Sequence, residues 1–279
     1  MSDSTSHSRA KMLAEAAIMV AIATVLSLIK LLNLPYGGSV TVACMLPIII
    51  ISYRHGLRWG MLTGFVFGLI QQLLDLNTLS YVTTWQSVIA VILLDYFLAF
   101  MVIGLGGIFR DRMSQPKALV AGTIFVCVIR YLCHVISGAT VWAGLSIPTN
   151  AALLYSIGYN ATYMIPETIV TAVLAFTVGS ILDFSGDRVR HFVPKSKRDK
   201  RSFPIFEALG ALFLAAVLFF DVRSVFMNLQ NAETGEFDAT GFANVNWIAV
   251  AIFSVIGIAL SVTFYMLGRK KRENEREGE

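Results

Sequence analysis

Four residues spaced four apart in an apolar segment are the most chemically informative feature of this chain. They are Arg130, His134, Gly138 and Trp142. Residues four apart lie along one face of a helix. Ionisable side chains at membrane depth are costly, and they usually face a cavity or a partner. The spacing therefore predicts one wall of a polar binding pocket inside a bilayer.

Asp95 would bring a negative charge to such a pocket, because it lies well inside the apolar stretch VILLDYFLAF. A carboxylate at that depth should be neutralised by protonation, by a basic side chain or by a cationic ligand. Pairing with Arg130 or His134 would give it a structural role. We favour recognition of a positively charged ligand, since intramembrane ionisable residues are functional by default.

Aromatic residues near the ends of the apolar segments are candidates for contact with a cation. Trp142 and Tyr155 would lie near the outer surface, where aromatic belts also occur. Trp142 shares its helical face with His134, which favours a ring that faces a ligand; such a contact contributes about 2 kcal/mol once desolvated. Trp85 and Tyr96 are weaker candidates of the same kind.

A second polar face follows on the next apolar segment. Asn160, Tyr163 and Glu167 recur at intervals of three and four, and Pro166 is expected to kink the helix. The Asn160 amide has donors and an acceptor for the edge of a heterocycle. Glu167 fits a structural anchor, with Arg130 as its partner, as well as it fits a ligand contact.

The loop NLPYGGSVT, residues 33–41, would connect two segments at the outer surface. Its glycines allow backbone angles that other residues avoid. It is either a tight connection or a lid over the pocket, with Tyr36, Gly37 and Gly38 as the lid residues.

Composition places the chain in the membrane. Of 279 residues, 56% are hydrophobic and 14% charged, with a mean hydropathy of +0.69; soluble domains carry about 25% charged residues. We predict an all-α polytopic membrane protein. Spans of about 20 apolar residues are expected near 12–33, 39–53, 59–76, 86–109, 118–144, 153–183, 204–226 and 246–268.

The basic residues predict the orientation. If the N-terminus lies inside, nearly all of the 22 Lys and Arg residues fall in inside loops or at the inside ends of the spans, as the positive-inside rule requires. Both termini are then cytoplasmic, and no signal-peptide cleavage is expected. The basic run RVRHFVPKSKRDKR fits contact with the anionic inner leaflet better than binding to nucleic acid.

The chain is predicted to divide near residue 190. Residues 1–185 form a six-span membrane domain that holds every pocket candidate, and 186–203 form a basic cytoplasmic linker. Residues 204–268 form a two-span extension, and 269–279 a charged cytoplasmic tail. No internal repeat supports an inverted-repeat carrier.

Several chemistries are disfavoured. No Walker GxxxxGK[ST], HExxH or GxSxG motif is present, so neither ATP hydrolysis nor another enzymatic activity is predicted. Cys44, Cys127 and Cys133 lie in apolar stretches without a CxxC pair and are expected to be buried, free thiols. No metal site or cofactor is predicted.

Together, the strings PYGGSVT, MLPI, YRHG, LLDYFLAF, HVISGATVW and LLYSIGYNATYMIPE resemble the thiamine-specific S components of energy-coupling factor (ECF) transporters over about residues 10–185. The resemblance implies a six-helix protein that captures thiamine from outside. It would dock on a transmembrane coupling subunit with two ATPases, through the small residues Ala17 and Ala21. Taken with the candidates above, the expected thiamine-binding residues are Asp95, Tyr96, His134, Gly138, Trp142, Tyr155, Asn160, Trp85 and Arg130.

The implied roles follow the chemistry of thiamine, which carries a thiazolium cation and an aminopyrimidine. Trp142 would stack, Asp95 would recognise the charge or the amine, and Gly138 would leave room for the ligand. His134, Tyr155 and Asn160 would donate or accept hydrogen bonds.

This chain departs from the family in three places. It has Asp95 where a glutamate is common and Arg130 where a lysine is expected. The expected lid tryptophan is missing from the first outer loop, where Tyr36 is the available aromatic residue.

Three alternatives remain open from the sequence. The first is an S component for another vitamin or a thiamine precursor. The second is a proton-coupled carrier that uses Asp95, Glu167 and His134 as a relay. The third is a membrane scaffold that binds no small molecule.

Overall fold

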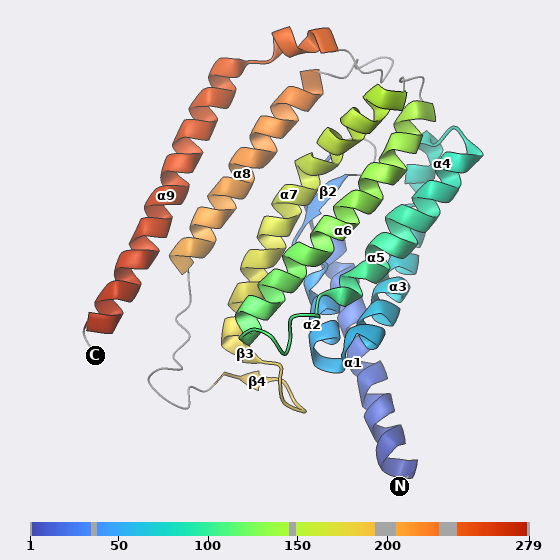
Figure 1. Ribbon diagram of the computed structural model, residues 1–279, viewed down its shortest axis with the longest axis vertical. Coiled ribbons are helices and arrows are strands. Elements are labelled where there is room, and N and C mark those ends of the chain that lie inside the picture. Colours follow the sequence, from blue (N-terminus) through green and yellow to red (C-terminus); the bar gives the residue numbers. More distant parts are fainter. Residues whose placement is uncertain (1, 35–37, 145–148, 193–204, 229–238, 278–279) are drawn as a thin grey trace.

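The computed structural model describes residues 2–34, 38–144, 149–192, 205–228 and 239–277 (Figure 1). It is predominantly helical, which confirms the all-α class. The elements are α1 (Ser2–Leu28), β1 (Lys30–Asn33), β2 (Ser39–Thr41), α2 (Leu46–His55), α3 (Leu57–Leu74), η2 (Leu76–Tyr81), α4 (Trp85–Ala90), η3 (Val91–Leu98), α5 (Ala99–Met101), η4 (Val102–Leu105), α6 (Gln115–Gly144), α7 (Thr149–Ile181), β3 (Leu182–Asp183), β4 (Arg190–His191), α8 (Ile205–Asn228), η6 (Ala239–Asn244) and α9 (Trp247–Glu277).

Within the described residues, six helical segments are long and apolar enough to cross a membrane, compared with the eight spans expected. The expected span at 39–53 was wrong, because α2 has only 10 residues and is about 15 Å long, half of a bilayer core. Pro47 lies in its first turn, where the missing N–H is tolerated. The third expected span corresponds to α3, which is 18 residues long but includes Arg58 and two glutamines.

The first helix ends earlier than expected. It stops at Leu28 rather than near residue 33, because the chain turns into β1, which pairs antiparallel with β2. Lys30 lies opposite Thr41, and Asn33 opposite Ser39. The expected outer loop is therefore flanked by a short β-hairpin, and β2 leads directly to the buried helix α2.

The core of the bundle surrounds α2. Residues Leu46 to Arg54 of this helix are all buried. The hydrophobic core includes Met45, Ile48 and Ile49 together with Phe67 of α3 and Ile103 of η4. Because α2 is buried on all sides, its first residues are as apolar as those of a membrane span, although the helix is too short to cross a membrane.

The fourth span is not a regular α-helix. Residues Val91–Leu98 form the π-helix η3, between α4 and α5. Gly68 of α3 lets this segment approach closely, since a Cβ at that position would collide with the carbonyl oxygen of Tyr96. π-helical turns are rare and are frequent at functional sites, and Asp95 lies in this one.

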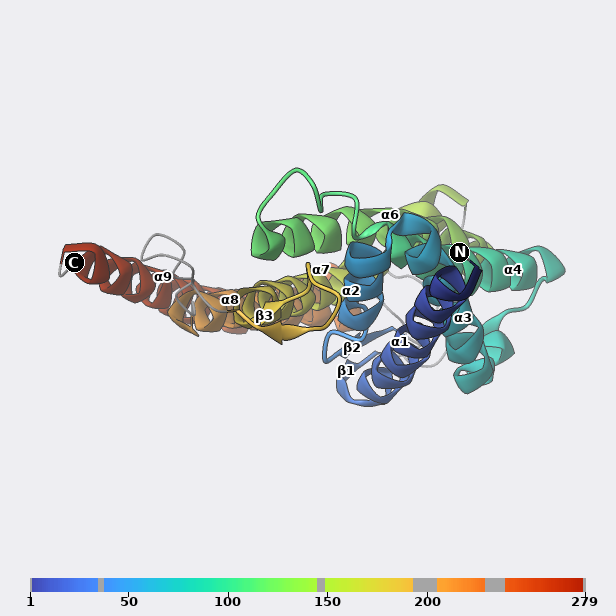
Figure 2. The same ribbon diagram turned by 90° about the horizontal axis from the view of Figure 1, so that it is seen from below.

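The two C-terminal helices lie side by side in a row with α7. In Figures 1 and 2, α8 lies beside α7, α9 lies beyond α8, and α1 lies on the other side of the bundle. Many large apolar side chains of α9 are exposed, as expected of a lipid-facing helix. The expected helical pair is thus present, while the proposed domain boundaries stay a prediction.

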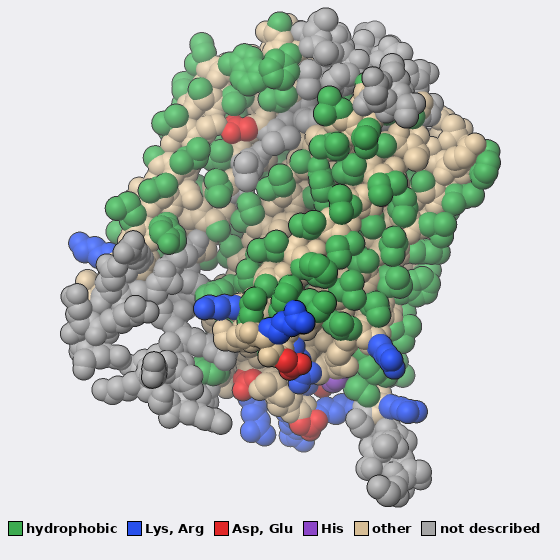
Figure 3. All heavy atoms as spheres, viewed as in Figure 1, with side chains coloured by type: hydrophobic (Ala, Val, Ile, Leu, Met, Phe, Trp, Pro, Cys, Tyr) green, Lys and Arg blue, Asp and Glu red, His purple; other side chains and the backbone are tan. Residues whose placement is uncertain are grey.

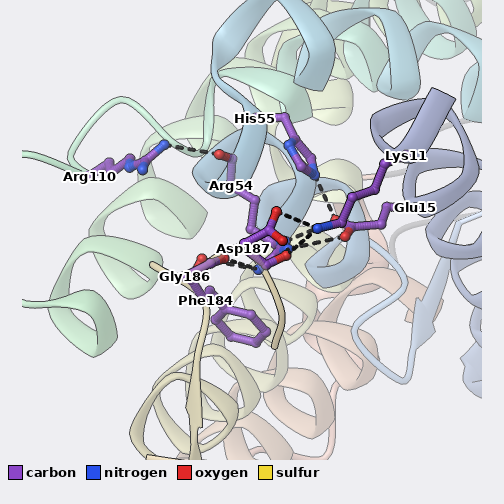
Figure 4. A network of polar contacts seen from close by, with 8 residues as sticks. All are labelled: Lys11, Glu15, Arg54, His55, Arg110, Phe184, Gly186 and Asp187. Atoms are coloured by element: carbon purple, nitrogen blue, oxygen red, sulfur yellow. Dashed lines mark hydrogen bonds and ion pairs between the residues drawn. The ribbon is translucent and has the colours of Figure 1, made fainter. Parts of the chain in front are cut away.

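Lys and Arg side chains gather at the end of the bundle from which α1 begins (Figure 3). There Arg54, at the end of α2, is almost fully buried. Its Nε and Nη2 donate to the Glu15 carboxylate of α1 at 3.1 and 3.2 Å. Its guanidinium also donates to the carbonyl oxygens of Phe184, Gly186 and Asp187, in the turn between β3 and β4 (Figure 4). We call this set, with Lys11 and His55, the Arg54 network.

Two further contacts complete the Arg54 network. His55 Nε2 lies 2.7 Å from a Glu15 oxygen, and Lys11 donates to the carboxylate and the carbonyl of Asp187. The Lys11 amine holds the pKa of the exposed Asp187 carboxyl below its usual range. The Lys11–Asp187 contact is therefore fully present above that range, and it is lost as the pH falls through the lowered pKa. The network connects α1 and α2 to the β3–β4 turn, which precedes the C-terminal extension.

Candidate functional site

A polar cavity of about 230 Å³ lies between the β1–β2 hairpin, α3, η2, η3, α6 and α7. Its walls mix ionisable, hydroxyl and aromatic side chains. The lining residues used below are Lys30, Gly38, Thr41, Cys44, Asp75, Asp95, Tyr96, Phe100, Arg130, His134, Gly138, Tyr159, Asn160, Tyr163 and Glu167.

Most of the residues expected to bind a ligand meet in this cavity. Those that line it are Asp95, Tyr96, Arg130, His134, Gly138 and Asn160, together with Gly38 of the expected lid. Three of them, Arg130, His134 and Gly138, belong to the helical stripe that the sequence indicates on α6. The contribution of each residue to binding stays a prediction.

Other expected residues lie elsewhere. Tyr155 is buried outside the cavity lining and stacks on Tyr159 with a centroid distance of 6.4 Å. Trp85 of α4 is 69% exposed and is not in the lining. The side chain of Trp142 and the lid residues Tyr36 and Gly37 lie outside the described residues.

Asp95 makes two polar contacts with α6. Its Oδ1 lies 2.8 Å from His134 Nδ1, and its Oδ2 accepts a hydrogen bond from Ser137 Oγ at 2.8 Å. His134 Nε2 lies 3.4 Å from Arg130 Nη2. A neutral imidazole protonated at Nδ1 fits both contacts, since Nε2 then accepts from the guanidinium. Each carboxylate oxygen keeps a lone pair for a further donor.

Arg130 forms no ion pair with any carboxylate in the described part of the chain. Its Nη1 lies 2.8 Å from Met45 Sδ, its guanidinium lies 4.6 Å from the centre of the Phe100 ring, and its buried Nε has no partner there. The expected Arg130–Glu167 anchor was therefore wrong. A cation–π contact and a polarisable sulfur surround this cation instead.

Glu167 binds the β1–β2 hairpin. One carboxylate oxygen accepts from the Thr41 amide at 2.5 Å, and the other accepts from Thr41 Oγ1 at 2.7 Å. Tyr159 Oη accepts from the Gly38 amide at 3.1 Å. Sequence reasoning missed Tyr159 and Thr41. A signal for Tyr159 was present, because residues 155, 159, 163 and 167 repeat at intervals of four.

Asn160 and Gly138 have structural neighbours that the sequence did not indicate. Asn160 Nδ2 donates to Ser156 O at 2.9 Å, and its Oδ1 accepts from Tyr163 Oη at 2.5 Å. A Cβ at Gly138 would lie 2.5 Å from Ser156 Oγ. Gly138 thus allows α6 and α7 to approach closely, and Asn160 holds the Tyr163 ring in the cavity wall.

Residues 13–182 match a family model described as thiamine transporter protein (Thia_YuaJ). The chain belongs to this family. The matched region contains every cavity residue named above, and it ends before α8 and α9. Because the family is one of membrane transporters, the six candidate spans are those of a multi-pass membrane protein.

Individual members of the thiamine transporter family agree with this assignment. The thiamine transporter ThiT of Bacillus subtilis is 35% identical over 174 residues, which cover 58% of this chain and 86% of that protein. ThiT of Lacticaseibacillus paracasei is 24% identical over 185 residues, which cover 60% and 86%. A solved structure of ThiT from Listeria monocytogenes has a TM-score of 0.51 and 25% identity, and covers 62% of this chain and 94% of its own.

Proposed function

We propose that this protein is the thiamine-capture subunit of an ECF-type importer in the bacterial plasma membrane. It would bind thiamine from outside in the cavity between η3, α6 and α7, and then dock on a coupling subunit with two ATPases. The observation that carries this proposal is an acidic, aromatic-lined cavity within the region that matches the thiamine transporter family.

The charge of the cavity supports a cationic ligand. Its described lining has three carboxylates, on Asp75, Asp95 and Glu167, and two cations, on Lys30 and Arg130. With a neutral His134, these formal charges leave one net negative charge. An excess charge in a partly buried site favours a counter-charge, and the single positive charge of a thiazolium ring supplies one.

The aromatic side chains of the cavity support the same ligand class. The rings of Tyr96, Phe100, Tyr159 and Tyr163 all reach the lining. Aromatic faces attract desolvated cations, and the tyrosine hydroxyls add donors and acceptors for an aminopyrimidine edge. These rings supply an aromatic surface from η3, α5 and α7 as well as from the expected Trp142.

The distribution of basic side chains supports cytoplasmic termini. Lys and Arg gather at the end of the bundle where α1 begins (Figure 3), and the positive-inside rule assigns that end to the cytoplasm. The hairpin and the cavity then face outward. Ala17 and Ala21 are exposed on α1, so they are accessible to a coupling subunit at a small-residue helix contact.

Titration of the purified full-length protein with thiamine tests the ligand. Calorimetry should show one site per chain, and an uncharged analogue that lacks the thiazolium should bind much more weakly. Absence of heat with well-folded protein would contradict the thiamine assignment.

Reconstitution tests the transport mechanism. In proteoliposomes, we expect thiamine uptake only when the coupling subunit, both ATPases and ATP are present. Uptake by the protein alone, driven by a proton gradient, would contradict the ECF mechanism and support the carrier alternative.

A further inference from the structure

A groove of about 550 Å³ lies between helices α8 and α9 of the C-terminal extension. Every described residue of its lining is apolar or glycine. The lining residues used below include Phe213, Ala216, Val217 and Phe220 of α8 and Gly257 of α9. The match to the thiamine transporter family ends at residue 182, so this groove is separate from the cavity described above.

The groove is about as long as one leaflet of a bilayer is thick. On α9 its lining extends from Ala249 to Leu260, which is about 16 Å along the helix axis. The hydrocarbon core of a bilayer is about 30 Å thick. The apolar span of α9 begins at Trp247, so the groove starts near that end of the span and reaches the middle of the membrane. One acyl chain of one leaflet covers the same depth.

Contacts between the two helices close the floor and the inner end of the groove. A Cβ at Gly257 would collide with Val217 Cγ2, so the backbone of α9 packs directly against α8 beneath the groove. Phe213, at the inner end of the lining, stacks on Phe264 with ring centroids 5.5 Å apart. Ile256 in the lining is 56% exposed. The groove is therefore open to lipid along its length and closed by apolar side chains elsewhere.

Arg223 continues the groove face of α8 beyond the lining. It follows Ala216 by seven residues and Phe220 by three, and these intervals place side chains on one face of a helix. Arg223 forms no ion pair with a carboxylate in the part of the chain that the structure describes. Asp221 lies on another face of α8 and accepts a hydrogen bond from Ser254 of α9 at 2.6 Å. The guanidinium is therefore available to a ligand in the groove.

The position of Arg223 is unusual for a basic residue in a membrane protein. Helix α8 begins toward the basic end of the bundle and runs away from it, and Arg223 lies close to its last residue, Asn228 (Figures 1 and 3). In the orientation proposed above this is the outer end, where the positive-inside rule leaves few basic residues. An arginine at this depth extends to the level of the lipid headgroups, where phosphate is the available counter-charge.

We propose that the groove and Arg223 form a binding site for one phospholipid of the outer leaflet. An acyl chain occupies the groove between α8 and α9, and the guanidinium of Arg223 donates hydrogen bonds to the lipid phosphate, whose geometry it matches. The phosphate is recognised, and the rest of the headgroup is not. The site does not depend on the ligand of the cavity.

Native mass spectrometry with phosphatidylglycerol tests the phosphate contact. The purified full-length protein should retain one lipid more tightly than any that bind after it. Arg223→Gln should weaken this first binding by about 10-fold, because charge-assisted hydrogen bonds are lost, and Arg223→Lys should weaken it less. The matched control is Arg112→Gln, which removes an exposed arginine outside the groove lining and should leave the first binding unchanged.

Diacylglycerol with the same acyl chains separates the groove from the phosphate. It should bind more weakly than phosphatidylglycerol, and Arg223→Gln should not change its binding. Ala216→Phe places a ring in the groove and should abolish the first binding of both lipids. Ala251→Phe is the matched control, since Ala251 is an exposed alanine of α9 outside the lining; it should bind both lipids like the wild type. All of these variants should keep the wild-type Tm in lipid-free detergent.

Two results would overturn the proposal. Equal affinity of the wild type, Arg223→Gln and Ala216→Phe for phosphatidylglycerol would mean that the lipid around α8 and α9 is bound without a site. A dimer without retained lipid that dissociates in Ala216→Phe would make the groove an interface between two copies of the chain. Neither result bears on the cavity, so thiamine binding is tested separately.

Discussion

Replacement of Asp95 by asparagine is expected to weaken thiamine binding by about 30-fold or more, which corresponds to a loss of at least about 2 kcal/mol, the lower end of the range for one member of a buried charge pair. Asparagine keeps the size of the side chain and an oxygen that faces His134 Nδ1. It removes the charge that leaves the lining of the cavity with a net negative value. A thiazolium would then enter a cavity without a counter-charge, and calorimetry at fixed ionic strength should show the weaker affinity.

Two further variants separate the effect of the Asp95 charge on binding from an effect on folding. Asp95→Glu keeps the charge on an arm that is one methylene longer, so it should retain most of the affinity. Asp111→Asn removes a carboxylate that is 95% exposed and far from the cavity lining, and it should bind like the wild type. Near-wild-type affinity of Asp95→Asn would show that Asp95 is only the structural partner of His134.

Replacement of Arg54 by methionine is expected to lower the free energy of unfolding by about 2 to 3 kcal/mol. Removal of one member of a buried ion pair usually costs about 3 to 5 kcal/mol, and the cost is reduced here because the Glu15 side chain is 26% exposed. The variant also leaves three carbonyl oxygens of the β3–β4 turn without their donor. Thermal unfolding of the ligand-free protein in detergent should show a lower Tm.

The matched control is Arg58→Met. Arg58 is an exposed arginine close in sequence, at the start of α3, so its loss should leave the Tm nearly unchanged. Equal Tm values for the two variants would mean that the Arg54 network does not stabilise the bundle.

The sequence predicted the wall of the cavity well, because a four-residue interval defines one helix face whatever the rest of the fold. Arg130, His134 and Gly138 lie in the lining for this reason, and four residues that the sequence indicated on other grounds, Asp95, Tyr96, Asn160 and Gly38, line it as well. The period of a helix does not show which neighbour faces that stripe. Arg130 was therefore one of two contacts considered for Glu167, the other being a ligand, whereas the structure gives Thr41, which precedes it by 126 residues.

The spans were less predictable. Hydropathy does not distinguish a short helix buried on all sides from a lipid-exposed helix. The apolar sequence of α2 therefore predicted a full membrane span. The π-helix around Asp95 depends on the close approach of Gly68 to the Tyr96 carbonyl. That contact is tertiary and leaves no periodic signal in VILLDYFL.

The half-length helix α2 has a consequence for how this protein could acquire new ligands. A complete helix at this position would fill the whole depth of the bundle with apolar side chains, whereas here a strand and the cavity take up the half away from Arg54. The two halves are chemically separate: the half that ends at Arg54 is held by the Arg54 network, and the other half is bounded by side chains of the hairpin, η3 and α7. Substitutions that reshape the cavity half are therefore expected to leave the Arg54 end intact, so ligand preference can diverge on a scaffold whose other end stays constant.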